Sequence, residues 1–188
     1  MTETVRPLAD TNGALAPDRP VLGADPDLVR RALRHHAKGV AVVTAGIGHR
    51  PVGFCATSVV SLSLDPPLMS FTVGLRSSSW PVVRCAPHVM VQLLAAGQEQ
   101  VARTFGGSGR ARFGPATRWH RGAHGLPVLD GVLAWLVLAP VHHLSVSDHA
   151  LVIGRVTRAW HARGGQPLVH HNGGYARLSA DLAVPGDE

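Results

Sequence analysis

Short apolar runs separated by turns, with a few stretches of helical spacing, set the pattern of this chain. A helix is expected from Asp25, because aspartate caps helix starts and Pro26 suits the first helical turn. Apolar side chains follow at helical spacing, and Gly39 is expected to end the helix. The β-branched run 40–44 and the run 52–58 are then expected to pair as a hairpin across a turn at 46–49.

The remainder of the chain continues this alternation of strands and turns. Two short helices are expected at 81–86 and 98–105, followed by a glycine- and arginine-rich loop at 105–118. Strands are expected at 68–73, 88–94, 132–143, 150–160, 168–169 and 175–178. Alternating strand–helix units are absent, so the pattern predicts a mainly β fold with short helices, arranged as an antiparallel barrel.

Residues 53–67 (GFCATSVVSLSLDPP) mix small, hydroxyl-bearing and apolar side chains, and we expect the fold to be organised around them. Gly53 and Ala56 would let a flat ligand approach the backbone closely. Proline restricts the residue before it, so the end of the stretch is expected to form an extended corner. The pattern suits a wall for a planar cofactor, although Ser/Thr-rich strands also serve purely structural roles. Three apolar side chains are expected to be buried: Val59, Leu62 and Leu64.

Length and composition fit one globular domain, since 188 residues can bury a sizeable core and 45% of them are hydrophobic. We expect a flexible leader at 1–24, a domain at 25–180 and a tail at 181–188. The net charge of +6 raises the question of nucleic acid, but the arginines are scattered and aromatic residues make up only 5%. An anionic small ligand explains the bias equally well. No signal peptide or membrane-spanning run is visible, so the cytoplasm is the expected location.

Cysteine and histidine give no metal or disulfide pattern. Cys55 and Cys85 form no CxxC pair, and Cys55 is interpreted as a small buried thiol. Among the 12 histidines, His120 and His124 have helical spacing, but Gly122 lies between them and no helical pattern surrounds them. No metal site is therefore predicted.

Two polar clusters are candidate binding residues. Ser77, Ser78 and Ser79 follow Arg76 at a predicted helix start, where free N–H groups and hydroxyls favour a phosphate. The alternative is a plain serine cap beside a solvated arginine. His149 follows Asp148 at the mouth of a strand, where an imidazole can donate to a polar ligand. A solvent-exposed turn histidine is the alternative there.

Seven segments, in this order and spacing, resemble the short-chain flavin reductase family, whose FMN-binding split barrel is a homodimer. They are HHAKGVAVVTA, GFCATSVVSLSLDPPL, RSSSW, QEQVARTFGG with ARF, LPVLDGVLAWL, DHALVIGRV and PLVHHNGGYARL. The resemblance runs from about Asp27 to Leu178. It implies hydride transfer from NADH or NADPH to FMN or FAD, with the reduced flavin passing to a partner monooxygenase.

The resemblance also implies roles for individual residues. It places Cys55, Ala56, Thr57 and Ser58 along the isoalloxazine and its polar edge. The flavin phosphate would be held by Arg76, Ser77 and Ser79, with Arg112 and Phe113 near the ribityl-phosphate end. His149, as the catalytic residue, would face the nicotinamide, with His171 and Tyr175 near the same substrate.

The chain departs from the family pattern at four positions. The family commonly has Thr and Asn where this chain has Cys55 and Thr57, and basic residues where it has Ser78 and Gly174. Two alternatives to the reductase therefore stay open. One is a flavin-binding protein of the same fold without reductase activity, acting as a carrier, sensor or accessory. The other is an FMN oxidoreductase that acts directly on an organic substrate.

Overall fold

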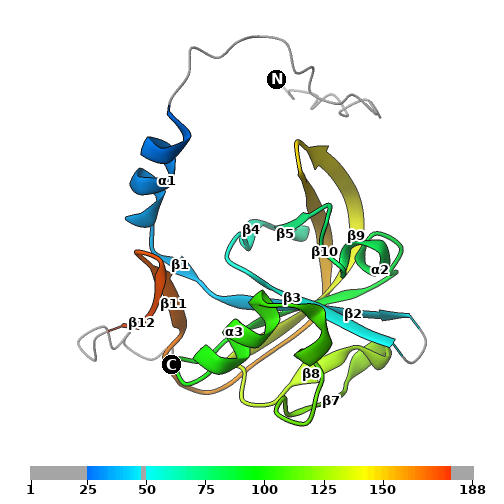
Figure 1. The fold of residues 1–188 in the computed structure, drawn as a ribbon. Coiled ribbons are helices and arrows are strands. Elements are labelled where there is room, and N and C mark those ends of the chain that lie inside the picture. The colour runs from blue at the N-terminus through cyan, green and yellow to red at the C-terminus, as the bar shows by residue number, and fades with distance from the viewer. Residues whose placement is uncertain (1–24, 48–49, 179–188) are drawn as a thin grey trace, which may run out of the picture.

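A seven-stranded antiparallel sheet carries most of the chain in the computed structural model, which describes residues 25–47 and 50–178 (Figure 1). The predicted leader 1–24 and tail 181–188 lie outside these residues. The strand order is β3 (Arg50–Ala56), β2 (Ala41–Ile47), β6 (Val89–Leu93), β9 (Ala134–Val146), β10 (His149–His161), β5 (Pro67–Gly74) and β4 (Val60–Leu64). Every neighbouring pair is antiparallel, which confirms the predicted fold class.

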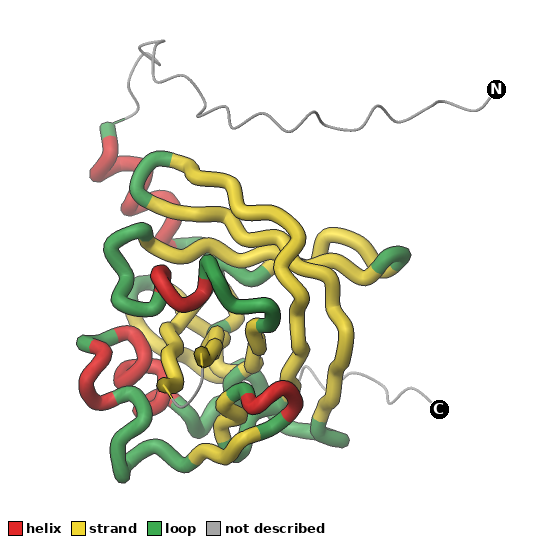
Figure 2. Tube along the Cα trace, turned by 90° about the vertical axis from the view of Figure 1, so that its right-hand side faces the viewer, coloured by secondary structure: helices red, strands yellow, loops and turns green. Residues whose placement is uncertain are grey.

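Two smaller sheets and three helices flank this sheet. One small sheet contains β1 (Lys38–Gly39), β11 (Leu168–His171) and β12 (Gly174–Arg177), and the other pairs β7 (Trp119–Arg121) with β8 (Pro127–Leu129). The helices are α1 (Pro26–Arg34), α2 (Trp80–Val83) and α3 (Glu99–Gly106), with short 3-10 turns at Gly109–Ala111 and Ala123–Gly125. Figure 2 shows the two long strands of the β9–β10 hairpin running side by side.

The predicted hairpin and long strands are confirmed, whereas several boundaries are not. β2 pairs with β3 as expected, and the apolar runs 132–143 and 150–160 form the thirteen-residue strands β9 and β10. The first helix ends at Arg34 instead of at Gly39, because Gly39 pairs with Val169 in β1. The second helix has four residues, Trp80–Val83, instead of spanning 81–86.

Two apolar clusters cover opposite faces of β2. Val43 packs in one cluster with Phe71, Leu138 and other fully buried side chains. Val42 packs in the other with Phe105 of α3. A strand that is buried on both faces needs apolar residues at consecutive positions, which accounts for the continuous run at 40–43.

The expectation that Leu62 and Leu64 are buried is wrong for this chain. They lie on β4, the edge strand, and Leu64 is 86% exposed. Apolar spacing predicted burial, but the strand has no neighbour on its outer side.

In the described part of the chain, no helix is both long enough and apolar enough to cross a membrane.

Candidate functional site

The carbonyl of Gly53 joins two loops that are far apart in the sequence. Arg112 donates from Nη1 to this carbonyl over 2.6 Å and to the Ser79 hydroxyl over 3.1 Å. Ser79 itself donates to the Gly53 carbonyl over 3.0 Å, and Arg112 also donates from Nη2 to the Gly107 carbonyl over 2.7 Å. The structure therefore brings the serine loop and the glycine-rich loop together at β3.

Arg112 is a buried cation whose charge no carboxylate of the described chain balances. It is 8% exposed, and it forms no ion pair with the described acidic residues. Its Nε is buried without a hydrogen-bond partner, and burial lowers the pKa of its guanidinium. A buried charge is stabilised by a counter-ion, so a phosphate fits this position.

The serine loop supplies side chains to this cluster, but its helix is too short to add a helix dipole. Ser79 caps the four-residue α2 without a side-chain cap bond and is fully buried in the Arg112 network. Ser77 is half-buried and accepts from the Ser79 backbone N–H, while Arg76 is exposed. Hence Ser77 and Arg76 can reach a ligand directly, and Ser79 positions Arg112.

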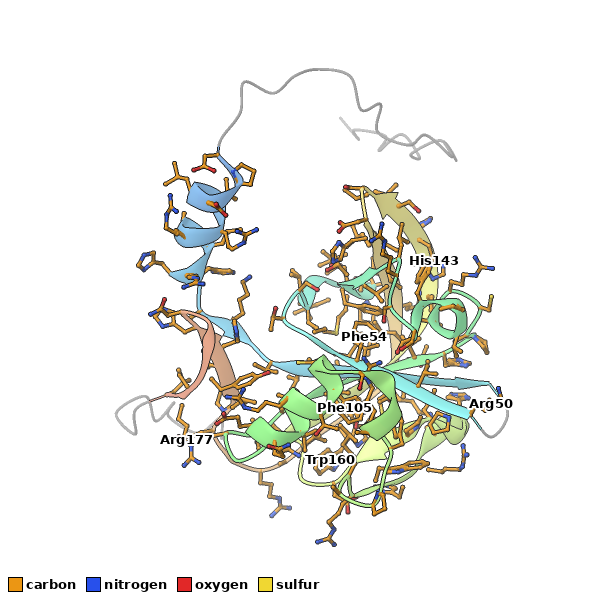
Figure 3. All side chains as sticks on the ribbon, in the orientation of Figure 1. Arg50, Phe54, Phe105, His143, Trp160 and Arg177 are labelled. Atoms are coloured by element: carbon orange, nitrogen blue, oxygen red, sulfur yellow. The ribbon has the colours of Figure 1, made fainter. Side chains whose placement is uncertain are left out.

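Within residues 53–67, Gly53 was expected to face a flat ligand, but it packs against α3 instead. A Cβ at Gly53 would lie 2.9 Å from Phe105 Cε1 and 3.0 Å from the Val43 carbonyl. The missing side chain therefore admits α3 rather than a flat ligand. Figure 3 labels Phe105 near Phe54, at the centre of the molecule where α3 meets β3.

The end of β3 and the loop after it do leave groups available to a ligand. Ala56 is buried, and Thr57 is half-buried in the loop between β3 and β4. The Ser58 hydroxyl accepts from the Thr72 backbone N–H over 3.0 Å and from the Thr72 hydroxyl over 2.8 Å. This anchors Ser58 against β5 while its own proton remains available to an acceptor.

The structure brings Cys55 and Tyr175 together, from β3 and β12. The two side chains are hydrogen-bonded, and burial raises the pKa of the Cys55 thiol. Burial and the neighbouring thiol also raise the pKa of Tyr175, over whose ring Arg103 lies at 5.2 Å. Both groups are therefore neutral at pH 7. Cys55, interpreted from the sequence as a small buried thiol, is half-buried in the structure.

We expect Cys55 to be alkylated by iodoacetamide at least about tenfold more slowly than Cys85 near pH 8, because thiolate is the reactive form. Cys85 is exposed and serves as the internal control. Burial raises the pKa of Cys55 in the folded state above its value in the unfolded chain. The free energy of unfolding is therefore expected to fall as the pH rises above the ordinary thiol pKa. Peptide mass spectrometry over time measures both rates, and equal rates would contradict the assignment.

His170, which the sequence did not single out, shares a face with Tyr175, whereas His171 does not. His170 lies directly opposite Tyr175 in the β11–β12 pair, and their rings meet edge to face at 5.7 Å. His171 lies opposite Gly174, and successive strand residues point to opposite faces. His171 as a neighbour of the nicotinamide stays a prediction, and the structure places His170 nearer to Tyr175.

His149 lies beside the serine loop. It stands opposite Gly74, and its Nδ1 is 2.7 Å from Asp148 Oδ1. The backbone N–H of Leu75 donates to the Asp148 carbonyl over 2.9 Å, so this turn adjoins the loop of Arg76. The hydrogen bond from His149 is the main cause that lowers the pKa of Asp148. The described neighbours of His149 are thus different from those of Tyr175.

Phe113, His88 and His124 have packing roles in the structure. Phe113 packs edge to face against Phe105 at 5.2 Å and against Trp119 at 5.3 Å. His124 stacks on His88 at 3.9 Å instead of pairing with His120. Within residues 25–47 and 50–178, no group of three His, Cys, Asp or Glu side chains is placed to hold a metal ion.

Comparison with known proteins decides the family. The model of the flavin reductase like domain matches residues 33–179. The chain belongs to this family. An NADH:FMN oxidoreductase from Rhodococcus qingshengii is 40% identical over 174 residues, which cover 86% of this chain and 90% of that protein. The reductase component of a 4-hydroxyphenylacetate 3-monooxygenase from Thermus thermophilus is 37% identical over 150 residues, covering 79% and 94%.

Solved structures agree with this flavin reductase assignment. A Streptomyces globisporus NADH:FAD oxidoreductase, solved in complex with NAD and FAD fragments, superposes with a TM-score of 0.79 at 31% identity. The match covers 84% of this chain and 95% of that one. A flavin reductase domain protein from Arthrobacter sp. gives a TM-score of 0.76 at 33% identity, covering 86% and 98%.

Proposed function

We propose that this member of the flavin reductase family transfers hydride from NADH or NADPH to FMN, with FAD as an alternative acceptor. The observation that carries the proposal is the buried, uncompensated Arg112 at the meeting point of the serine loop and β3. Flavin phosphate is an anion of the kind that this cation would bind. The Rhodococcus relative is named an NADH:FMN oxidoreductase and the Streptomyces relative an NADH:FAD oxidoreductase, which supports NADH as the donor and either flavin as the acceptor.

The residues near Arg112 would bind and orient the flavin, which itself carries the redox chemistry. Arg76 and Ser77 would contact the phosphate, and Ser79 would hold Arg112 in place. Ala56, Thr57 and Ser58 would line the isoalloxazine. Hydride and its electron pair pass from the dinucleotide to the flavin, and solvent supplies one further proton. Such a reaction needs stacking room and fixed orientation more than a strong acid or base.

His149 and Tyr175 would act on the nicotinamide side of this reaction. His149 is exposed and hydrogen-bonded to Asp148, so its Nε2 is left to face a ligand. Tyr175 would pack near the nicotinamide through its contact with Cys55. His149→Ala should then slow hydride transfer more than it weakens FMN binding, and the reverse pattern would move His149 to the flavin site.

A flavin-binding protein without reductase activity is the second candidate. The contact between the Cys55 thiol and Tyr175 favours this candidate, because the thiol then offers no strong hydrogen-bond donor to the flavin edge. The two functions are separated by steady-state oxidation of NADH and NADPH with FMN, FAD and riboflavin in turn. We expect turnover with at least one pair, whereas binding of flavin without any turnover would favour the carrier.

The reduced flavin would pass to a partner monooxygenase in the cytoplasm. The Thermus relative and a Rhodococcus jostii relative, 32% identical over 163 residues, are named as reductase parts of monooxygenases. Oxygenase activity that appears only when this chain, NADH and flavin are all present would support this role. Equal activity with chemically reduced flavin alone would remove the need for a specific contact between the two proteins.

We further propose a homodimer that covers the exposed edge of the sheet. The edge strand β4 exposes Val60, Leu62 and Leu64. Further into the sheet, beyond β5 and β10, the far half of β9 exposes Val141, Leu144 and Val146. Apolar edge strands of this kind invite pairing. Leu62→Asp should convert a dimer to a monomer in light scattering, whereas Leu178→Asp, at another exposed position, should not. A wild-type monomer would contradict the proposal.

A further inference from the structure

A cavity of about 480 Å³ lies between α1 and the β11–β12 turn, outside the cluster around Arg112. Figure 1 shows α1 projecting above β1, β11 and β12, apart from the seven-stranded sheet. The Asn172 backbone N–H donates to the Arg34 carbonyl over 2.9 Å, which fixes the turn to the end of α1. Val29 and Leu33 give the cavity an apolar side, while Arg34 and Lys38 give it positive charge.

The charges around this cavity are one-sided. None of its lining residues is acidic. Arg30 pairs with Asp27 and Arg31 with Asp25, whereas Arg34 and Lys38 form no ion pair within the described residues. Lys38 is half-buried and is the only lysine of the chain. Cations that lack counter-ions beside an apolar surface suit a ligand with a flat apolar part and an anionic part.

A row of side chains connects the cavity to Tyr175. In the small sheet, Lys38 lies opposite His170, and His170 lies opposite Tyr175. Directly opposed residues share a face, so these three side chains cross the sheet on one side. Two strand spacings separate β1 from β12, which is about 10 Å. Because His170 both lines the cavity and contacts Tyr175, the cavity begins one side chain away from the proposed nicotinamide position.

We propose that this cavity binds the adenosine diphosphate end of the reduced pyridine dinucleotide. Lys38 and Arg34 bind its phosphates, and Val29 and Leu33 pack against the adenine. The row through His170 lets one dinucleotide reach from the cavity to Tyr175. The assignment rests on the proposed reductase function, and it places dinucleotide binding on α1 and β1, which lie outside the flavin-binding loops.

Calorimetric titration of the flavin-free protein with ADP tests the cavity without requiring turnover. We expect Lys38→Gln and Arg34→Gln each to weaken ADP binding about tenfold, through loss of a charge-assisted contact. Val29→Asp, which adds a repelling carboxylate at an exposed helix position, should weaken it as well. Arg31→Gln is the matched control, because Arg31 lies on the same helix outside the lining. Absence of ADP binding, or equal affinity in all variants, overturns the proposal.

Turnover adds a second readout that separates this proposal from the reductase function. Lys38→Gln should raise KM for NADH about tenfold with kcat unchanged, and should leave oxidation of reduced nicotinamide riboside, which lacks both phosphates and the adenosine, unaffected. Equal effects on the two donors would overturn the cavity assignment. ADP binding that responds to Lys38 in a protein without hydride transfer would retain the cavity and reject the reductase. NADH turnover that does not change in Lys38→Gln would retain the reductase function and reject the cavity assignment.

Discussion

Replacing Arg112 with methionine is expected to weaken FMN binding roughly thirtyfold, because the buried cation that we propose binds the phosphate is lost. The same change leaves the carbonyls of Gly53 and Gly107 without their guanidinium donors. Unpaired buried acceptors cost free energy, while removal of an uncompensated buried charge offsets part of that cost. We expect the free energy of unfolding to fall by about 1–3 kcal/mol.

Fluorescence titration of FMN and chemical denaturation measure these two effects of Arg112→Met. Arg118→Met is the matched control, because the Arg118 side chain is 88% exposed and its Nε lies 3.6 Å from Asp130 Oδ2. It should change neither quantity measurably. Riboflavin lacks the phosphate, so its affinity should differ less between the wild type and Arg112→Met than the affinity for FMN does. An unchanged FMN affinity in Arg112→Met would show that the phosphate lies elsewhere.

Gly53→Ala is expected to lower the free energy of unfolding by about 1–3 kcal/mol through overpacking. The added methyl group would meet Phe105 at 2.9 Å and the Val43 carbonyl at 3.0 Å, and the backbone atom cannot swing aside. Because the Gly53 carbonyl also holds Arg112 and Ser79, displacement of β3 should weaken FMN binding too.

Gly39→Ala is the matched control for Gly53→Ala, since a Cβ at Gly39 has no neighbour within 4 Å. Thermal and denaturant unfolding of both variants gives the comparison. If Gly53→Ala were as stable as wild type while FMN binding was lost, Gly53 would face the ligand instead of α3.

The main strands were predictable because their apolar residues are consecutive or alternating over long runs. β9 and β10 are thirteen residues each, and the β-branched run of β2 is buried on both faces. Local sequence could not predict that Gly39 would enter β1, because that strand forms only by pairing with Val169, far along the chain. Leu64 had the spacing of a buried residue but lies on an edge strand.

Parts of the site were predictable for a different reason. Arg112 was selected through family resemblance, and Ser79 both through the resemblance and as part of the serine cluster; the structure joins them at one carbonyl. No local pattern could reveal that Ser79 supports Arg112, since their contact joins loops 33 residues apart. His170 and His171 are equivalent in the sequence, and only the register with β12 shows which of them faces Tyr175.

Anaerobic mixing of the purified protein with NADH and FMN tests the central claim most directly. We predict that the flavin absorbance bleaches with one equivalent of NADH consumed for each flavin reduced, at a rate that increases with protein concentration. Admission of oxygen should restore the oxidised flavin. Bound flavin that keeps its oxidised spectrum in excess NADH, and equally in excess NADPH, would contradict the reductase assignment.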